Sequence, residues 1–237
     1  MVQSSLLSYL RIKIPEIAST DVISDVNLLI VLNLACTEFI KETDALPTSG
    51  TFNLVLNQSE YSLSTCLPTY GKVRKEGLWI YNLVNTKWTR LDPTTIPYLN
   101  QNYPSWLNTA AGLPYRYSLD GDTLTLHPKA SSTYAGNNYL KLFYYKRSVD
   151  MSNSSHYPFA GATIQYTHLA NYERVLIDYV RYEVKEMLGK AQDAAKDQMA
   201  FYTKCGLIKK ELLSRPDLIS EIRATGAGNF NFHKGAF

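Results

Sequence analysis

The chain has 237 residues, enough for one large domain or two modest ones, and its 24 Lys and Arg against 21 Asp and Glu give a net charge of +3. Apolar residues make up 45% of the chain and charged residues only 19%, which excludes a disordered chain, because disorder needs low hydrophobicity and high net charge. The small net charge also excludes a protein that binds nucleic acid through bulk charge alone.

The first segment, residues 1–46, predicts helices. A short helix over residues 4–11 precedes a longer helix, which Ser24 or Asp25 caps and which ends near Thr43. The apolar stripe of the longer helix follows the i, i+3, i+4 rule and consists of Val26, Leu29, Ile30, Cys36, Phe39 and Ile40. Neighbouring apolar residues widen this stripe, so we expect the helix to be buried on most sides.

Residues 47–151 predict a β region. Short segments that alternate apolar and polar residues indicate strands at 51–57, 61–64, 72–81, 87–91, 116–119, 123–127 and 139–145. We expect one hairpin around Asn85-Thr86 and another around Asp120-Gly121-Asp122, because Asp-Gly suits the positive φ of a tight turn. Residues 96–113 are rich in Pro, Asn and Tyr, and predict a long loop with one helical turn.

Residues 152–222 return to a helical pattern, in which Gly189 marks a break between two helices. The apolar face of the first helix consists of Leu169, Tyr172, Leu176, Val180, Val184, Met187 and Leu188. On its outer face we expect two i, i+4 ion pairs, Arg174 with Asp178 and Glu186 with Lys190.

The second C-terminal helix is expected over residues 193–214. Its apolar stripe consists of Met199, Phe201, Tyr202, Cys205, Ile208 and Leu212. Residues 223–237 show no periodicity and are rich in Gly, Asn and Phe, which predicts a flexible arm.

This order of segments predicts an α+β fold. Each helical stripe needs a partner, so the N-terminal helices of residues 1–46 should pack with the helix hairpin of residues 152–222 as an antiparallel bundle. Residues 47–151 are then an inserted antiparallel β domain, and residues 223–237 an extended C-terminal arm.

The sequence contains no recognisable catalytic motif. It has no Gly-x-Ser-x-Gly elbow and no His-Glu-x-x-His arrangement, and its three Cys lie too far apart for a zinc motif. Asp120-Gly121-Asp122 lacks the later oxygen ligands of a calcium loop, so the turn is the better interpretation. We therefore expect a protein that is not an enzyme and that has no metal or cofactor. The start of the chain shows no signal-peptide pattern, and no apolar run reaches the roughly 18 residues of a membrane span.

The three Trp are the strongest candidates for a binding surface. Trp79, Trp88 and Trp106 all lie in the β region, together with 11 of the 18 Tyr. They could form a partner-binding surface, a carbohydrate platform, or a stack for single-stranded bases near the basic residues at 72–75. A simpler interpretation, which we favour, makes Trp79 and Trp88 cross-strand partners within one hairpin.

A family resemblance emerges in the second half of the chain. Three parts of the chain together resemble a recurring module of the head-to-tail adaptor (connector) proteins of tailed bacteriophages, in particular those with short tails. They are the strand pair from Tyr117 to Pro128, the strand from Tyr139 to Arg147 and the two C-terminal helices. Leu32-Asn33-x-Ala35 in the early helix is similar to the first helix of that family. The resemblance extends over residues 20–214.

The resemblance implies a virion structural protein. Such adaptors form homo-oligomeric rings of about twelve subunits that dock under the portal protein, extend the DNA channel and carry tail or further ring proteins. The chain would assemble in the host cytoplasm, occupy the portal–tail junction of the virion and let the genomic DNA pass without sequence-specific binding. No membrane contact is implied. The alternative is a carbohydrate- or nucleic-acid-binding module that uses the aromatic surface of the β domain.

The same resemblance assigns roles to two groups of residues. The arm would bind the portal protein through Arg223, Phe230, Phe232, Lys234 and Phe237, since aromatic side chains anchor well in apolar pockets. The basic residues Arg116, Lys146 and Arg147, which lie at strand ends, are candidates for a mildly positive channel lining.

Overall fold

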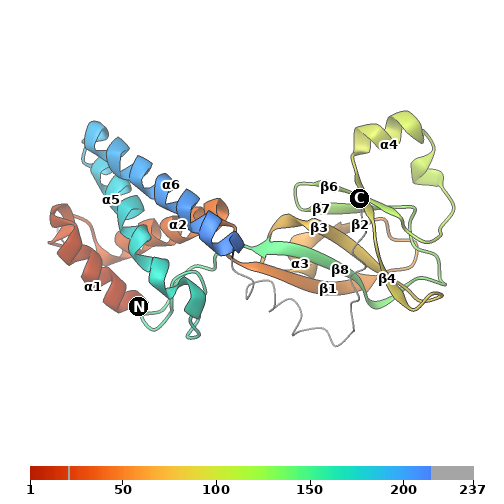
Figure 1. Ribbon diagram of the computed structural model, residues 1–237, viewed down its shortest axis with the longest axis horizontal. Coiled ribbons are helices and arrows are strands. Elements are labelled where there is room, and N and C mark those ends of the chain that lie inside the picture. The colour runs from red at the N-terminus through yellow and green to blue at the C-terminus, as the bar shows by residue number, and fades with distance from the viewer. Residues whose placement is uncertain (21, 215–237) are drawn as a thin grey trace.

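The computed structural model describes residues 1–20 and 22–214 and has a mixed α+β fold (Figure 1). Its elements are α1 (Gln3–Lys13), η1 (Pro15–Ile17), α2 (Asp25–Thr43), β1 (Pro47–Leu54), β2 (Glu60–Ser62), α3 (Leu63–Cys66), β3 (Tyr70–Asn82), β4 (Lys87–Arg90), β5 (Asp92–Thr94), α4 (Ile96–Asn102), η2 (Trp106–Asn108), β6 (Arg116–Asp120), β7 (Thr123–His127), β8 (Gly136–Lys146), η3 (Thr167–Val175), α5 (Leu176–Met187) and α6 (Ala191–Ser214). Helices α1, α2, α5 and α6 gather at one end of the molecule and the strands at the other.

Helix α2 begins and ends where the sequence predicts. The backbone N–H of Asn27 donates to the Ser24 hydroxyl at 3.3 Å, which caps the start, and Asp44 adopts a left-handed conformation (φ 53°) that ends the helix. The predicted stripe is wrong at two positions, because Val26 and Ile30 are exposed. The buried face is instead made of Leu28, Val31, Leu32, Ala35, Cys36, Phe39, Ile40 and Thr43.

The helical region has one apolar core, to which α1, α2, α5 and α6 all contribute. Its fully buried side chains include Leu10 of α1, Phe39 of α2, Leu176 of α5 and Phe201 of α6. Burial of a side chain of this size contributes about 1.5–3 kcal/mol, so this core holds together segments that are far apart in the sequence.

The two C-terminal helices differ from the prediction in which side chains they bury. Met187 and Leu188 of the first expected face, and Met199 and Tyr202 of the second, are exposed, whereas the remaining members of both stripes are buried. The break between the helices is confirmed at Gly189, whose positive φ of 72° suits glycine.

The local ion pairs expected on the first C-terminal helix are wrong. The Asp178 carboxylate instead accepts from the Lys204 ammonium of α6 at 2.5 Å, and Lys190 lies 3.9 Å from Glu16 of η1. The Asp178 side chain is buried against α6, so little water can solvate its carboxylate. The ammonium of Lys204 makes up for that lost solvation.

The β region contains two four-stranded sheets, in the orders β1-β8-β3-β4 and β2-β7-β6-β5. Both predicted hairpins are confirmed, β3–β4 and β6–β7, and positive φ angles at Thr86 and Gly121 close their turns. One pair departs from the antiparallel prediction. β5 runs parallel to β6, because residues 95–115, which include α4, form the crossover that a parallel pair requires.

The two sheets enclose a second apolar core. Alternate residues of β3 and β8 point into it, among them Leu78, Ile80, Leu140 and Leu142, and Leu126 of β7 lies within the same core. The intervening residues of β3 and β8 therefore lie on the outer face of the β1-β8-β3-β4 sheet.

Asp44, the residue that ends α2, joins the helical region to the β region. Its carboxylate pairs with Lys72 of β3 at 3.5 Å and with Lys209 of α6 at 2.8 Å. The backbone N–H of Lys146 also donates to the carbonyl of Leu46 at 2.9 Å. The two regions thus share polar contacts as well as the connecting chain.

Candidate partner-binding surfaces

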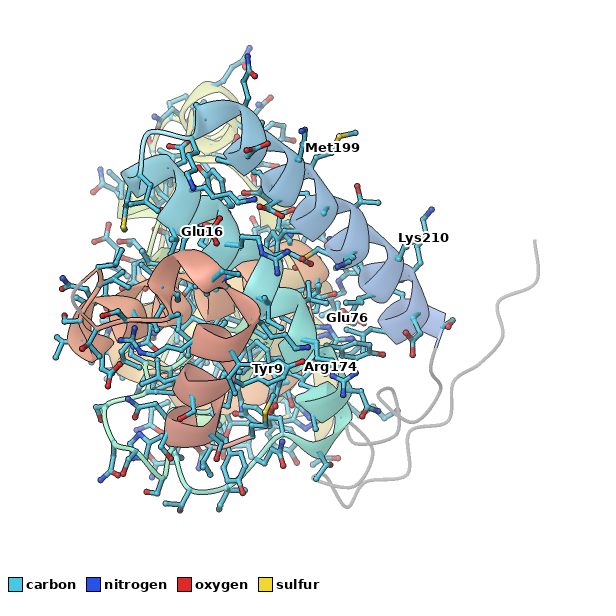
Figure 2. The ribbon with its side chains drawn as sticks, turned by 90° about the vertical axis from the view of Figure 1, so that its left-hand side faces the viewer. Tyr9, Glu16, Glu76, Arg174, Met199 and Lys210 are labelled. Carbon is cyan, nitrogen blue, oxygen red and sulfur yellow. The ribbon has the colours of Figure 1, made fainter. Side chains whose placement is uncertain are left out.

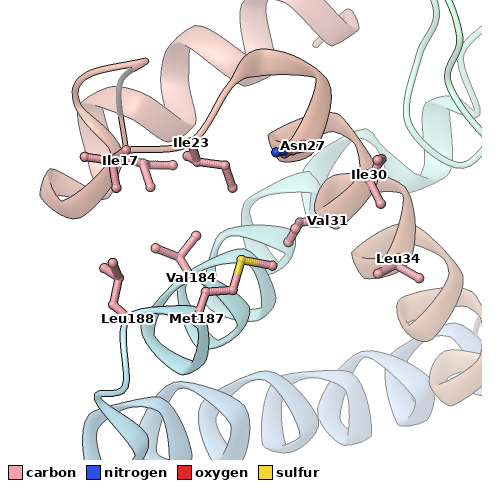
Figure 3. A pocket seen from close by; sticks show the side chains of 10 residues that line it. Ile17, Ile23, Asn27, Ile30, Val31, Leu34, Val184, Met187 and Leu188 are labelled. Atoms are coloured by element: carbon pink, nitrogen blue, oxygen red, sulfur yellow. The ribbon is translucent and has the colours of Figure 1, made fainter.

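An apolar groove opens on the helical region between η1, α2 and the end of α5 (Figure 3). It is lined by Ile17, Val22, Ile23, Asn27, Ile30, Val31, Leu34, Val184, Met187 and Leu188. Several of these side chains are exposed, among them Met187 at 62% and Ile30 at 55%. We call this set the helical groove.

The predicted apolar stripes place Ile30, Met187 and Leu188 in the core, so they do not predict this groove. The available signal was the width of the apolar surface on α2. A helix that is apolar around most of its circumference has more than one face that must be covered.

A second apolar surface lies along the outer side of α6. Met199, Leu207 and Leu213 are exposed there, while Phe201, Cys205 and Ile208 of the same helix are buried in the apolar core of the helical region. We call the three exposed residues the α6 outer strip. Exposed apolar surface of this kind often marks a contact with another protein.

An aromatic surface covers the outer face of the β1-β8-β3-β4 sheet. Trp88 lies opposite Tyr81 with ring centroids 5.5 Å apart, whereas Trp79 lies opposite Arg90 and packs on Phe143 at 6.3 Å. The expected direct pair of Trp79 with Trp88 is therefore wrong, although both residues lie in the same hairpin and on the same face. Alternation along β3 and β8 was the signal that could have found Tyr81 and Phe143.

Lys141 lies within this aromatic surface. Its ammonium lies 5.2 Å from the centre of the Phe143 ring, and burial lowers the pKa of Lys141. Tyr139 completes the row, with its ring 5.4 Å from that of Tyr81. The half-buried rings thus line one face of the sheet, with the basic side chains of Lys141 and Arg90 among them.

Trp106 lies apart from this surface. It is buried, and its indole N–H donates to the Asn100 side chain at 2.8 Å. Trp106 belongs to the crossover segment that contains α4, and its ring lies edge-on to that of His127 with the ring centroids 6.1 Å apart. Trp106 therefore packs the crossover onto β7 and offers little surface to a partner.

Arg116 is held among tyrosine rings. Its guanidinium carbon lies 4.8 Å from the centre of the Tyr103 ring, 5.4 Å from that of Tyr115 and 5.7 Å from that of Tyr98. The faces of tyrosine rings attract the planar guanidinium cation. These contacts therefore stabilise Arg116 next to the buried His127.

The structure does not bring the three basic candidates together. Lys146 lies at the end of β8, with its ammonium 5.9 Å from the centre of the Tyr166 ring. Arg147 is exposed and donates to the carbonyl of Pro68 at 3.0 Å. Arg116 begins β6, a strand of the other sheet, where its guanidinium lies against the tyrosine rings described above.

The arm, with Arg223, Phe230, Phe232, Lys234 and Phe237, lies outside the described residues. Over residues 1–20 and 22–214, no group of three His, Cys, Asp or Glu side chains is placed to hold a metal ion. Within the same residues, no helix is both long and apolar enough to cross a membrane.

Comparison with known proteins gives one family. Residues 4–217 match the family model described as SU10 adaptor protein, and no curated protein matches the chain significantly. This family consists of structural adaptor proteins of bacteriophages rather than enzymes, and its members are virion components that interact with other head and tail proteins. Because the match extends over nearly the whole chain, helical and β regions alike, the protein belongs to the SU10 adaptor protein family of bacteriophage head-to-tail adaptors.

Proposed function

We propose that this adaptor forms a homo-oligomeric ring of about twelve subunits, which docks under the portal protein, extends the DNA channel and carries tail or further ring proteins. Family membership supports the adaptor role. The observation that carries the ring is the uncovered apolar surface of the helical region, both in the helical groove and on the α6 outer strip. A single chain leaves these side chains in water, and a neighbouring subunit would cover them.

The arm is proposed to fasten the ring to the portal protein. Residues 223–237 contain three Gly, which let a chain adapt to a surface, and three Phe, which anchor in apolar pockets. Arg223 and Lys234 add positive charge to the same segment.

The channel lining is proposed to be only mildly positive. Strong positive charge would retain the genome, whereas a net charge of +3 over the whole chain leaves little general attraction for DNA. Lys146 and Arg147 are the better candidates for this lining, since the rings of Tyr98, Tyr103 and Tyr115 surround Arg116.

The aromatic surface of the β region is proposed to bind tail or further ring proteins. Half-buried Trp and Tyr rings give large contact area at a low entropy cost and are common in protein interfaces. Trp79 and Trp88 also suit the alternative, a carbohydrate or nucleic-acid platform. A glycan array and a gel shift with single-stranded DNA separate the two, using the chain and its Trp79→Ala/Trp88→Ala variant. Binding that the variant loses would favour the alternative.

The ring is tested by the mass of the purified full chain, measured by light scattering with and without its portal protein. We expect the portal protein to recruit many copies of the chain into one complex. A complex with a single copy per portal assembly would contradict the proposal.

A further inference from the structure

We propose that the aromatic surface of the β1-β8-β3-β4 sheet binds an acidic segment of a tail or further ring protein, in which one carboxylate pairs with Lys141. This partner chemistry rests on the proposed role of the aromatic surface and makes that role more specific. It follows from the position of Lys141 on the sheet and from where the carboxylates of the chain lie.

Lys141 lies on an interior strand of the sheet, among uncharged neighbours. It is directly opposite Thr51 of β1 on one side and Trp79 of β3 on the other. Phe143, two residues further along β8, points to the same face, and its ring centre lies 5.2 Å from the Lys141 ammonium. The Lys141 side chain is half-buried, so these neighbours replace part of the water around its charge.

The carboxylates near this face lie at the end of the sheet that adjoins the helices. Burial raises the pKa of Tyr145 near the end of β8, and the charges of Asp44 and Glu76 add to this effect. Figure 2, which looks at the helical end, shows Glu76 on the same side of the molecule as Lys210 of α6. Lys141 precedes Tyr145 by four residues, and this separation of about 13 Å along a strand exceeds the screening length of about 8 Å at physiological salt.

The basic residues at that end of the sheet are paired within the chain, whereas Lys141 is not. The Lys72 ammonium lies 3.5 Å from the Asp44 carboxylate, and the Arg74 guanidinium lies 2.9 Å from the Glu76 carboxylate. Among the described residues no ion pair includes Lys141, and burial alone lowers the pKa of its ammonium. The charge of Lys141 is therefore uncompensated.

This uncompensated charge determines which partner fits the surface. A purely apolar partner would remove the remaining water from the Lys141 ammonium and leave a buried charge without a counter-ion, which is costly. A carboxylate placed over Lys141 replaces that water, while apolar side chains on either side of it cover Trp79 and Phe143. A basic group at the same point would be repelled.

A single carboxylate fits this arrangement better than the backbone of a nucleic acid. Single-stranded nucleic acid carries a phosphate at every nucleotide and binds in grooves that contain several cations. The next basic residue on this face, Arg90, lies on the edge strand β4 and donates to the backbone carbonyl of Lys75 at 2.6 Å. One half-buried ammonium among aromatic rings therefore indicates an acidic protein segment.

Zero-length cross-linking of purified virions tests the pairing. A carbodiimide joins an amine to a carboxylate only where the two are in contact, and mass spectrometry of the digested particles identifies both residues. We expect Lys141 to be joined to an Asp or Glu of another virion protein. Lys185 and Asp197 are the internal control, because their charged groups lie 2.7 Å apart within one chain.

Two results of this experiment would overturn the inference. One is a cross-link between Lys141 and a second copy of this chain. The other is the absence of any cross-link at Lys141 in particles in which the control pair is joined.

Charge reversal then tests whether the pair holds the partner. In virions with Lys141→Glu, the amount of the cross-linked protein per particle should fall about tenfold or more, because two carboxylates would meet. Lys141→Arg should retain the partner. The matched control is Lys87→Glu, since Lys87 is exposed and lies opposite Asn82, on the other face of the same sheet.

A second substitution, in the partner, keeps a folding defect apart from a lost ion pair. Replacement of the partner's cross-linked carboxylate by Lys should restore attachment to the Lys141→Glu particle, which a misfolded chain could not show. Failure of this rescue, or full attachment of the partner to the Lys141→Glu particle, would contradict the pairing.

The Trp79→Ala/Trp88→Ala variant separates this inference from the proposed function. If that variant loses the partner and Lys141→Glu keeps it, the aromatic surface binds its partner without a carboxylate, and only the inference fails. If both variants keep the partner, the proposed role of the aromatic surface fails as well. A gel shift with single-stranded DNA that Lys141→Glu abolishes would assign the surface to nucleic acid and overturn the inference.

Discussion

The side-chain amide of Asn33 bonds both backbone groups of Met151. Nδ2 of the Asn33 side chain donates to the backbone carbonyl of Met151 at 3.2 Å, and the backbone N–H of Met151 donates to Oδ1 of the same side chain at 3.0 Å. Met151 follows the last strand and is almost fully buried, so water cannot replace these bonds. Asn33, a polar residue within the largely apolar α2, thus holds in place the backbone at Met151, where the chain returns from the β region to the helices.

Replacement of Asn33 by Ala should lower the free energy of unfolding by about 1–3 kcal/mol, because two buried backbone groups lose their partner. Urea denaturation measures this change. Asn27→Ala is the matched control, since Asn27 is exposed on the same helix. Equal losses in the two variants would show that the bonds to Met151 contribute nothing.

Replacement by alanine should change the stability of the fold in opposite directions at Gly77 and at Gly206. Gly77 has φ of 66°, and an added Cβ would lie 2.6 Å from the Tyr117 hydroxyl, so Gly77→Ala should cost about 1–3 kcal/mol. Gly206 is exposed in α6 with nothing near the added atom, so Gly206→Ala should stabilise by about 0.5–1 kcal/mol. Thermal unfolding of the two variants checks both signs, and a shift in the same direction would contradict the account.

His127 should make stability depend on pH. Burial, and secondly the positive charge of Arg116, lower the pKa of His127 below its ordinary value of 6.5. As pH falls below 6.5, the unfolded chain therefore binds the proton before the folded chain does, and the folded state loses stability. The stabilisation is fully present above pH 6.5.

The variant His127→Phe removes this titration and suits a site formed by the rings of Tyr103, Trp106 and Tyr115. We expect urea denaturation midpoints of the variant to vary less between neutral and mildly acidic pH than those of wild type. An unchanged slope would show that other groups carry the acid sensitivity.

Deletion of residues 226–237 should leave a folded protein that no longer binds the portal protein. Both described cores are formed by residues between Leu6 and Leu212, so we expect the circular dichroism spectrum and the unfolding midpoint not to change. Binding is measured by co-sedimentation with the portal protein. Full binding by the truncated chain would refute the proposed role of the arm.

Local signals in the sequence predict much of the fold. Asp120-Gly121-Asp122 predicts its hairpin because the turn residues alone determine the local backbone conformation. Ser24 and Gly189 mark helix ends for the same reason. These features depend on a few neighbouring residues, and the structure confirms them.

Features that depend on distant parts of the chain were harder to predict. Periodicity could not show which apolar side of α2 faces the core, so Ile30 was assigned to the wrong side. Asp178 pairs with Lys204 of another helix rather than with its neighbour in sequence, and the crossover that contains α4 decides the burial of Trp106. For the same reason the candidate surfaces, which combine residues from several elements, emerge only from the fold.

Electron microscopy of the full chain bound to its portal protein would show the ring itself. We expect a closed ring of this chain beneath the portal, coaxial with the DNA channel. Portal complexes that bind the chain without a ring, or that show no density for it at all, would contradict it.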